Sequence, residues 1–240
     1  FRVGNLLANV PPYTGIPMAV AVIGDTAFVA NLGIGVQAAP IPEMIQAPTS
    51  PANVEPGLMV LEEGGGASTP TCIVALRDLL FVGDMKKLWT RSASSGAVLG
   101  SIDSPVTALD AVAGLPVGGT LAKEESKRDV LFAVDRSGNL LIYGIAGSEA
   151  TSLITDNVYR LTFSSPNAVK AIAYDRLLYV GDSKGIHIVD VFNPAKPRIL
   201  GRVKGTGTSD FSKTVRDIDL GSSTGFAAVP DGVNGSVRSF

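Results

Sequence analysis

The chain has 240 residues, of which 45% are hydrophobic and 18% are charged, and its formal net charge is -2. This composition fits one ordinary soluble domain with a sizeable core, and the slightly acidic balance argues against nucleic acid or an anionic membrane as a partner, because both favour a basic surface. The single cysteine, Cys72, excludes an internal disulfide and a cysteine-rich metal site. The apolar stretches are shorter than the roughly 18 residues of a membrane span, so we expect no membrane insertion.

The N-terminal quarter predicts one isolated strand and a first group of strands. Residues 1–7 look like an outer strand without neighbours of its own. Residues 18–23 and 26–30 are runs of β-forming residues joined by a Gly-Asp turn, and residues 57–61 predict the third strand of this group. We find no clear fourth strand before the next group begins.

A Pro-rich loop insertion is predicted between the second and third of these strands, at residues 33–56. It contains five prolines, which lack the N–H that a sheet requires, at positions 40, 42, 48, 51 and 56. Loops of this length are uncommon in compact domains and are often functional. The segment from Gln37 to Ala52 is therefore our candidate binding loop.

The following segments predict two groups of four strands each, bounded by Gly, Asp and Asn. The second group is expected at residues 71–76, 79–82, 87–92 and 97–102. The third group is expected at residues 106–112, 130–134, 139–143 and 158–163, with an insertion at residues 114–127.

The clearest group lies at residues 168–205, and a shorter one follows it. Its strands are predicted at residues 168–174, 176–180, 186–191 and 198–203, with a turn at residues 181–185. Its segment Leu177-Leu178-Tyr179-Val180-Gly181-Asp182 is repeated in the second group as Leu79-Leu80-Phe81-Val82-Gly83-Asp84. The last group is expected at residues 215–220, 225–229 and 236–240.

The sequence Leu178-Tyr179-Val180 before a Gly-Asp turn, followed by Gly185-Ile186-His187-Ile188-Val189-Asp190-Val191 and Asn193-Pro194, resembles the LVIVD repeat of bacterial β-propellers. The resemblance is weaker in residues 71–102, 128–145 and 214–240. It implies a propeller fold. It also implies a surface or secreted module, because such propellers are mostly of this kind. They share no common chemistry, so the resemblance implies no particular reaction.

The groups together predict an all-β fold, a β-propeller of five four-stranded blades, with six blades as the alternative. The first strands of the groups begin about 35 to 62 residues apart, around the period expected of propeller blades. The last group lacks an outer strand, so we expect residues 1–7 to pair with residues 236–240 and close the ring. We expect one domain at residues 1–240, excised from a larger protein.

Polar residues recur directly after the second strand of each group, and they allow two interpretations. They are Asn31, Asp84, Asp135, Asp182 and Asp231. Four carboxylates on one face of a propeller could hold Ca²⁺, which would be the one cofactor of this protein. Asp and Asn beside Gly also stabilise turns by bonding backbone N–H groups. We favour the turn interpretation, because one carboxylate in each blade lies too far from the next to share an ion.

A second set of polar residues interrupts the predicted innermost strands: Asp110, Lys170, Arg216, Asp217 and Asp219. Glycosidases use paired carboxylates, so Asp110, Asp217 and Asp219 are the catalytic candidates for a carbohydrate hydrolase. Arg216-Asp217-Ile218 also resembles the Arg-Asp-Val that begins LVIVD repeats, where it helps to order neighbouring blades. We favour this structural interpretation, because buried carboxylates more often pair with cations or backbone N–H groups than react.

Neither the single histidine nor the single tryptophan indicates a reaction. We interpret His187, Trp89 and Cys72 as structural residues. The sequence therefore predicts a non-catalytic binding or scaffold module of a larger bacterial surface or secreted protein, with protein or other domains of the parent chain as partners. The alternative is a carbohydrate-active hydrolase.

Overall fold

The computed structural model describes residues 16–41, 59–61, 69–117, 126–154, 159–172, 176–203, 215–221, 224–231 and 234–240. Within these ranges the chain forms β-strands joined by turns, and none of its segments is a helix long and apolar enough to cross a membrane. The chain divides into two compact units, residues 1–106 and 107–240, and each is described by itself. The predicted strand at residues 1–7 lies outside the described residues.

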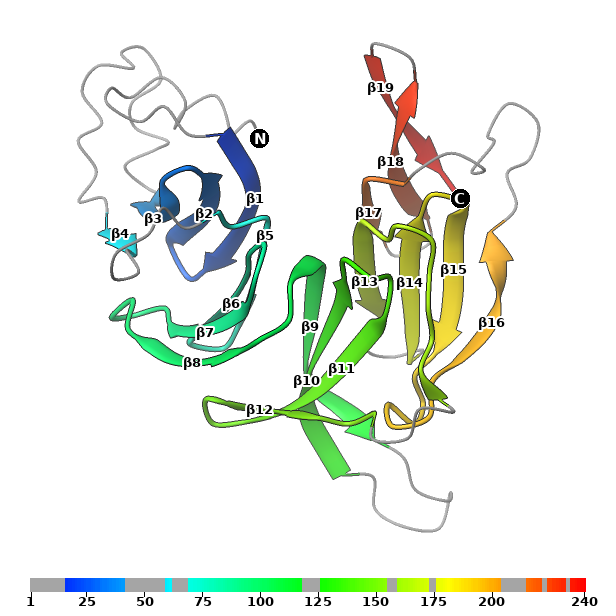
Figure 1. Ribbon diagram of the computed structural model, residues 1–240, viewed down its shortest axis with the longest axis horizontal. Coiled ribbons are helices and arrows are strands. Elements are labelled where there is room, and N and C mark those ends of the chain that lie inside the picture. Colours follow the sequence, from blue (N-terminus) through cyan, green and yellow to red (C-terminus); the bar gives the residue numbers. More distant parts are fainter. Residues whose placement is uncertain are drawn as a thin grey trace. The chain divides into compact units, whose positions relative to one another are not determined.

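The first unit holds two four-stranded antiparallel sheets (Figure 1). The first sheet contains β1 (Ile16–Ile23), β2 (Thr26–Leu32), β3 (Gly35–Pro40) and β4 (Met59–Leu61). The second contains β5 (Cys72–Leu76), β6 (Leu79–Gly83), β7 (Leu88–Ser92) and β8 (Val98–Ile102). In both sheets the strands lie side by side in chain order.

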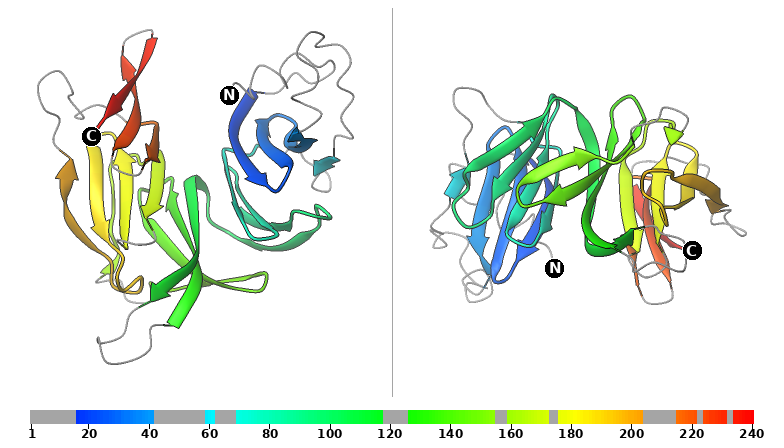
Figure 2. Two further views of the ribbon diagram at one scale, coloured as in Figure 1. Left: turned by 180° about the vertical axis from the view of Figure 1, so that it is seen from behind. Right: turned by 90° about the horizontal axis from the view of Figure 1, so that it is seen from below.

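The second unit holds three sheets with the same order of strands (Figure 2). The first contains β9 (Val106–Val117), β10 (Ser126–Asp135), β11 (Leu140–Ala146) and β12 (Glu149–Ser152). The second contains β13 (Ala168–Ile172), β14 (Leu177–Asp182), β15 (Gly185–Asp190) and β16 (Arg198–Val203). The third contains β17 (Asp217–Leu220), β18 (Gly225–Asp231) and β19 (Asn234–Ser239). The blades of a β-propeller are small antiparallel sheets of this kind, each typically with four strands. The predicted all-β, five-bladed propeller fold is therefore confirmed.

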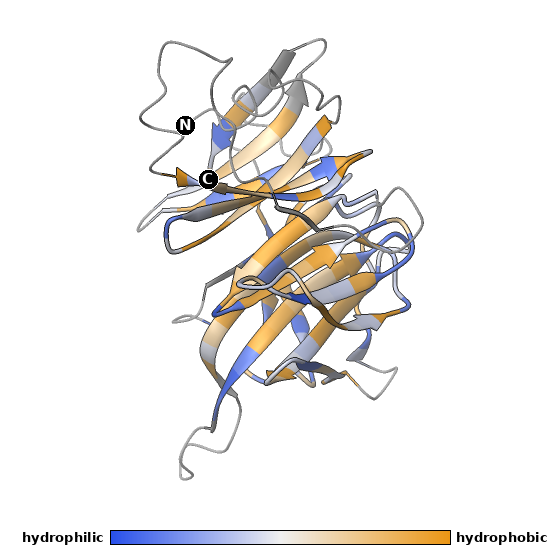
Figure 3. Cartoon of the chain, turned by 90° about the vertical axis from the view of Figure 1, so that its left-hand side faces the viewer, coloured by the Kyte–Doolittle hydropathy of each residue, from blue (hydrophilic) through white to orange (hydrophobic). Residues whose placement is uncertain are grey.

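The second strands of the four-stranded sheets are largely buried on both faces, and this explains their apolar sequences. In β10, every residue from Val130 to Val134 is 0% exposed. In β14, Leu178 and Val180 are 0% exposed. A strand between two neighbouring sheets cannot alternate apolar with polar residues, so these strands read as continuous apolar runs. Figure 3 shows apolar residues running along the strands, with polar residues toward their ends.

Apolar side chains from neighbouring sheets of one unit form its core. In the first unit, Phe28 and Val36 pack with Leu80 and Val82. In the second unit, one cluster joins the β9–β12 sheet to the β13–β16 sheet, and another joins the latter to β17–β19. The blades are therefore held together by side chains that none of them could bury alone.

Glycine near the end of a second strand lets a valine side chain approach the strand closely. A Cβ atom on Gly181 would lie 2.6 Å from Val215 Cγ1 and 2.8 Å from Val215 Cβ. A Cβ atom on Gly83 would collide with Val106 in the same way. Val106 begins β9, and Val215 lies just before β17. In the repeated Gly-Asp pair, the glycine is therefore required for packing, in addition to the part that the pair plays in the turn.

The prediction for the first sheet was wrong at its third strand. The structure places β3 at Gly35–Pro40, and the run predicted as the third strand is the fourth, β4. Gly33 and Gly35, with φ of 91° and 114°, reverse the chain directly after β2, so the third strand follows without a loop. The predicted insertion at residues 33–56 therefore starts too early, and residues 42–56 lie outside the described residues.

The predicted edge strand at residues 158–163 was also wrong. Its place is taken by β12, which pairs with β11 across a turn at Gly147, where φ is 60°. Thr162 makes only an isolated bridge to Asn139. A four-residue strand of mostly polar residues suits an exposed sheet edge, and its sequence gives no apolar pattern to detect.

The buried second strands lead to a prediction about stability. Leu80→Ala and Leu178→Ala should each lower the free energy of unfolding by about 2 to 5 kcal/mol, because both side chains are 0% exposed. Chemical denaturation measures the change. The control Leu99→Ala, at a side chain 44% exposed, should change it by less than about 0.5 kcal/mol. Equal losses at all three positions would contradict the assignment of the core.

The glycine contact leads to a second prediction. Gly181→Ala should lower the free energy of unfolding by about 1 to 3 kcal/mol, because the new Cβ atom overlaps Val215. The matched control is Gly201→Ala in β16, where a Cβ atom would meet nothing within 4 Å. That variant should unfold at the same or a slightly higher denaturant concentration. An unchanged midpoint for Gly181→Ala would show that the neighbouring blade does not press on this strand.

Candidate functional site

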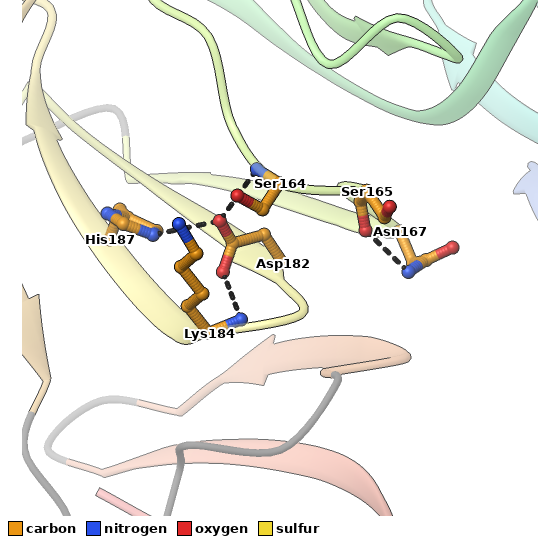
Figure 4. A network of polar contacts seen from close by, with 6 residues as sticks. All are labelled: Ser164, Ser165, Asn167, Asp182, Lys184 and His187. Carbon is orange, nitrogen blue, oxygen red and sulfur yellow. Dashed lines mark hydrogen bonds and ion pairs between the residues drawn. The ribbon is translucent and has the colours of Figure 1, made fainter.

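Asp182, at the end of β14, is the centre of a buried polar network (Figure 4). Its side chain is 1% exposed. Oδ1 accepts a hydrogen bond from the backbone N–H of Lys184 at 2.7 Å, and Oδ2 accepts one from that of Ser164 at 3.0 Å. His187 Nε2, on β15, lies 3.1 Å from Oδ2. The carboxylate thus joins its own turn to the third strand and to the segment that precedes the blade.

Asp84 and Asp135 make the same kind of contacts in their blades. Asp84 Oδ1 accepts hydrogen bonds from the backbone of Lys86 and Lys87, both at 2.6 Å, and its Oδ2 accepts one from Trp89 Nε1 at 2.8 Å. Asp135 accepts hydrogen bonds from both the backbone and the side-chain nitrogen of Asn139, at 2.8 Å each. In each blade one oxygen accepts backbone N–H groups of the turn, and the other accepts a hydrogen bond from a side chain in the third strand or, for Asp135, directly before it.

Asn31 makes the corresponding contact in the first sheet. Its Nδ2 donates to Gln37 Oε1 at 2.9 Å, and both residues are at most 2% exposed. The sequence indicated the polar residue after each second strand, but it did not indicate the third-strand partners. The signal that could have found them is a polar residue four to six positions further along: Gln37, Trp89, Asn139 and His187.

The backbone contacts of Asp84, Asp135 and Asp182 are the ones that the turn interpretation describes, and the calcium interpretation stays a prediction. In the part of the chain that the structure describes, no three His, Cys, Asp or Glu side chains are grouped so as to hold a metal. The side chain of Asp231 lies outside that part. Gln37, the first residue of the candidate binding loop, is buried in β3, and residues 42–52 of that loop are not among the described residues.

The inner-strand carboxylates lie on β9 and β17. Asp217 and Asp219 are exposed on one side of β17, while Ile218 between them is buried. Asp219 Oδ1 lies 3.7 Å from Lys170 Nζ on β13, so this ion pair joins two neighbouring blades. Asp217 Oδ1 accepts the backbone N–H of Ile218 at 2.9 Å. The Asp219 side chain is 80% exposed, so the pair contributes little to stability.

Arg216 and Asp110 complete the inner-strand set. The backbone N–H of Arg216 donates to the Ala228 carbonyl at 2.8 Å, which continues the ladder of β17, and the Arg216 side chain is exposed. Asp110 lies near the middle of β9 and is partly buried. The hydrolase interpretation stays a prediction.

An open pocket lies at the other end of the blade that contains Asp182. It has a volume of about 550 Å³ and is lined by Leu177, Asp190, Phe192, Asn193, Lys196, Arg198 and Leu200. Leu177 begins β14, Asp190 ends β15, and the loop between β15 and β16 supplies the aromatic and basic side chains. Sequence reasoning did not single out these residues.

Cys72 is buried beside Gly83, and burial raises the pKa of its thiol from 9.0 to about 12. At pH 8 the reactive thiolate fraction is therefore about a thousandfold lower in the folded protein than in the unfolded chain, and a thiol reagent should label the folded protein correspondingly more slowly. The unfolded chain loses this proton at lower pH than the folded one, so the thiol's contribution to stability is present below pH 9 and is lost between pH 9 and about 12. Denaturation of wild type and Cys72→Ala across this range measures the difference. A stability difference independent of pH would contradict a buried thiol.

Comparisons with known proteins bear on the fold. The model of the LVIVD repeat matches residues 172–205. A comparison with curated proteins gives no match. Among solved structures, the computationally designed Ika8 protein is similar with a TM-score of 0.51 and 12% identity, covering 96% of this chain and 72% of that one. The computationally designed Ika4 protein has a TM-score of 0.48 and 14% identity, covering 75% of this chain and 94% of that one.

At this identity the likeness to the Ika8 protein concerns the fold alone. The matched repeat begins at the end of β13 and covers β14, β15 and β16, which includes Asp182, His187 and the pocket residues. The resemblance to the LVIVD repeat noted in the sequence is thereby confirmed for this blade. The chain is a five-bladed, all-β propeller whose fourth blade matches the model of the LVIVD repeat at residues 172–205.

Proposed function

We propose that this propeller is a non-catalytic binding or scaffold module that contacts a protein or another ligand. The observation that supports the proposal is that the repeated carboxylates are hydrogen-bonded to the backbone. Asp84, Asp135 and Asp182 each accept hydrogen bonds from backbone N–H groups of their own turns. Carboxylates held in this way are committed to the fold and are poorly placed to act as an acid or a base.

The proposal extends to the setting in which the module works. A propeller of this repeat type suits a larger bacterial protein at the cell surface or outside the cell, with the partner being a protein or another domain of the parent chain. The net charge of -2 supports a partner other than nucleic acid. The open pocket at the ends of β14, β15 and β16 supplies a surface that such a partner can use.

One experiment separates this function from the hydrolase alternative. Asp182→Asn should lower the free energy of unfolding by about 1 to 3 kcal/mol, because one oxygen that accepts hydrogen bonds in a buried network is lost. Asp217→Asn and Asp219→Asn, at exposed side chains, should change it by less than about 0.5 kcal/mol. All three variants and the wild type should leave a panel of chromogenic glycosides uncleaved.

Glycoside cleavage by the wild type, lost in Asp217→Asn or Asp219→Asn while the unfolding midpoint stays the same, would overturn the proposal. Cleavage by the wild type that is lost only in Asp182→Asn, together with its stability, would also overturn the proposal and would show that Asp217 and Asp219 do not carry the reaction.

A further inference from the structure

The pocket on the fourth blade has a rigid wall. Its loop, between β15 and β16, begins where Asp190 Oδ1 accepts the backbone N–H of Phe192 at 2.8 Å. It continues with a turn in which the Asn193 side chain accepts the N–H of Ala195 at 3.1 Å, and the Asn193 carbonyl accepts that of Lys196 at 2.8 Å. A wall held by its own hydrogen bonds loses little entropy when a ligand binds.

The lining of this pocket is both apolar and basic. Leu200 is 53% exposed and Phe192 is 39% exposed, so apolar surface is open to solvent. Arg198 Nε donates to Asp190 Oδ2 at 2.9 Å, which offsets the charge of Arg198. Lys196 then leaves the lining with one net positive charge. The whole chain has a net charge of -2, so the net charge of the pocket lining is opposite in sign to that of the chain.

Two further contacts add basic and aromatic character around the pocket. The Arg176 guanidinium lies 4.4 Å from the centre of the Phe192 ring. Lys196 Nζ lies 5.3 Å from the centre of the Tyr159 ring. A cation over an aromatic face is fixed in position and can still bind an anion on its other side.

The second blade shows that the fold does not require this chemistry. Leu79 pairs with Ser92 there, as Leu177 pairs with Asp190 in the fourth blade, so the two loops can be aligned. Ser94 then stands at the place of Phe192, and Asp78 at the place of Arg176. In the second blade these two positions form a hydrogen bond from Ser94 Oγ to Asp78 Oδ2 at 3.2 Å.

The outer strands of the two blades match as well. Leu99 and Leu200 are each the extra residue of a bulge, because the pairing of β7 with β8 and of β15 with β16 shifts at these positions. The loop of the fourth blade, from Val191 to Pro197, is two residues longer than the loop from Ala93 to Ala97, and the added length carries Lys196. The blade architecture is shared, whereas the aromatic and basic lining belongs to the fourth blade.

From this lining we infer that the pocket binds a peptide segment in which acidic side chains alternate with apolar ones. This inference rests on the proposed function as a binding module. The apolar side chains would lie against Phe192 and Leu200, and a carboxylate would approach Lys196. A volume of about 550 Å³ is within the range of pockets for small ligands and can hold a few side chains of such a segment. A ligand with only negative charge would leave the apolar lining uncovered.

The test measures binding of labelled peptides to the full chain by fluorescence anisotropy. One hexapeptide alternates glutamate with leucine, a second has glutamine in place of glutamate, and a third has serine in place of leucine. The first should bind about tenfold more tightly than either of the others. Its affinity should fall as salt is added, since the charged contact is exposed.

Matched variants locate the site. Lys196→Glu should weaken binding of the glutamate–leucine peptide about tenfold or more, whereas Lys184→Glu, the same charge change at the other end of the same sheet, should not. Leu200→Ser should weaken it, whereas Leu99→Ser, at the equivalent bulge of the second blade, should not. Thermal unfolding of each variant verifies that the fold is kept, and Lys196→Gln serves if Lys196→Glu unfolds.

Equal binding of the glutamate and glutamine peptides would overturn the inference, as would equal effects of Lys196→Glu and Lys184→Glu, or a lack of saturable binding by the first peptide. None of these results would imply glycoside cleavage, so the proposed function would still be judged by its own assay. Binding of the glutamine peptide that is lost in Leu200→Ser would retain a binding module and reject an acidic ligand.

Discussion

The structure depends on the burial of its second strands on both faces. Such a strand needs a partner above and below its sheet, and the partners are side chains of neighbouring blades: Leu178 and Val180 of β14 share a cluster with Phe132 of β10. A single sheet of three or four strands cannot supply this burial, so one blade alone would be marginally stable. The blades of each unit are therefore repeats in sequence, but each blade needs the side chains of its neighbours to be stable.

The ends of the second strands combine two demands at adjacent positions. In Gly83-Asp84 and Gly181-Asp182, the glycine makes room for the side chain of Val106 or Val215, and the aspartate bonds its own turn and a side chain of the third strand. An acidic residue that recurs at one position of four of the five repeats invites a functional interpretation. Here its hydrogen bonds give it a structural reason to recur. At the opposite end of the sheets, the loops of the second and fourth blades differ in chemistry.

The class of the fold and most of its strands could be predicted from sequence, because apolar runs between Gly, Asp and Asn mark strands that are buried on both faces. The strands β6 and β14 were found within two residues of their bounds. The strands β3 and β12 were not, because an alanine-rich strand beside prolines and a short polar edge strand lack that signal. The bond from Asp182 to His187 depends on the register of a hairpin, which a single sequence does not give directly. The pocket was missed because its lining is assembled from three strand ends.

The bulges at Leu99 and Leu200 also affect how molecules of this protein meet one another. Each interrupts the hydrogen-bonding ladder of an outer strand, beside a second exposed apolar residue, Val98 or Ile199. An uninterrupted apolar edge of this kind would recruit strands from other copies and begin fibril growth. A kinked edge cannot offer the regular row of donors and acceptors that such growth requires. These two blades can therefore display apolar side chains at their rims without polymerising through them.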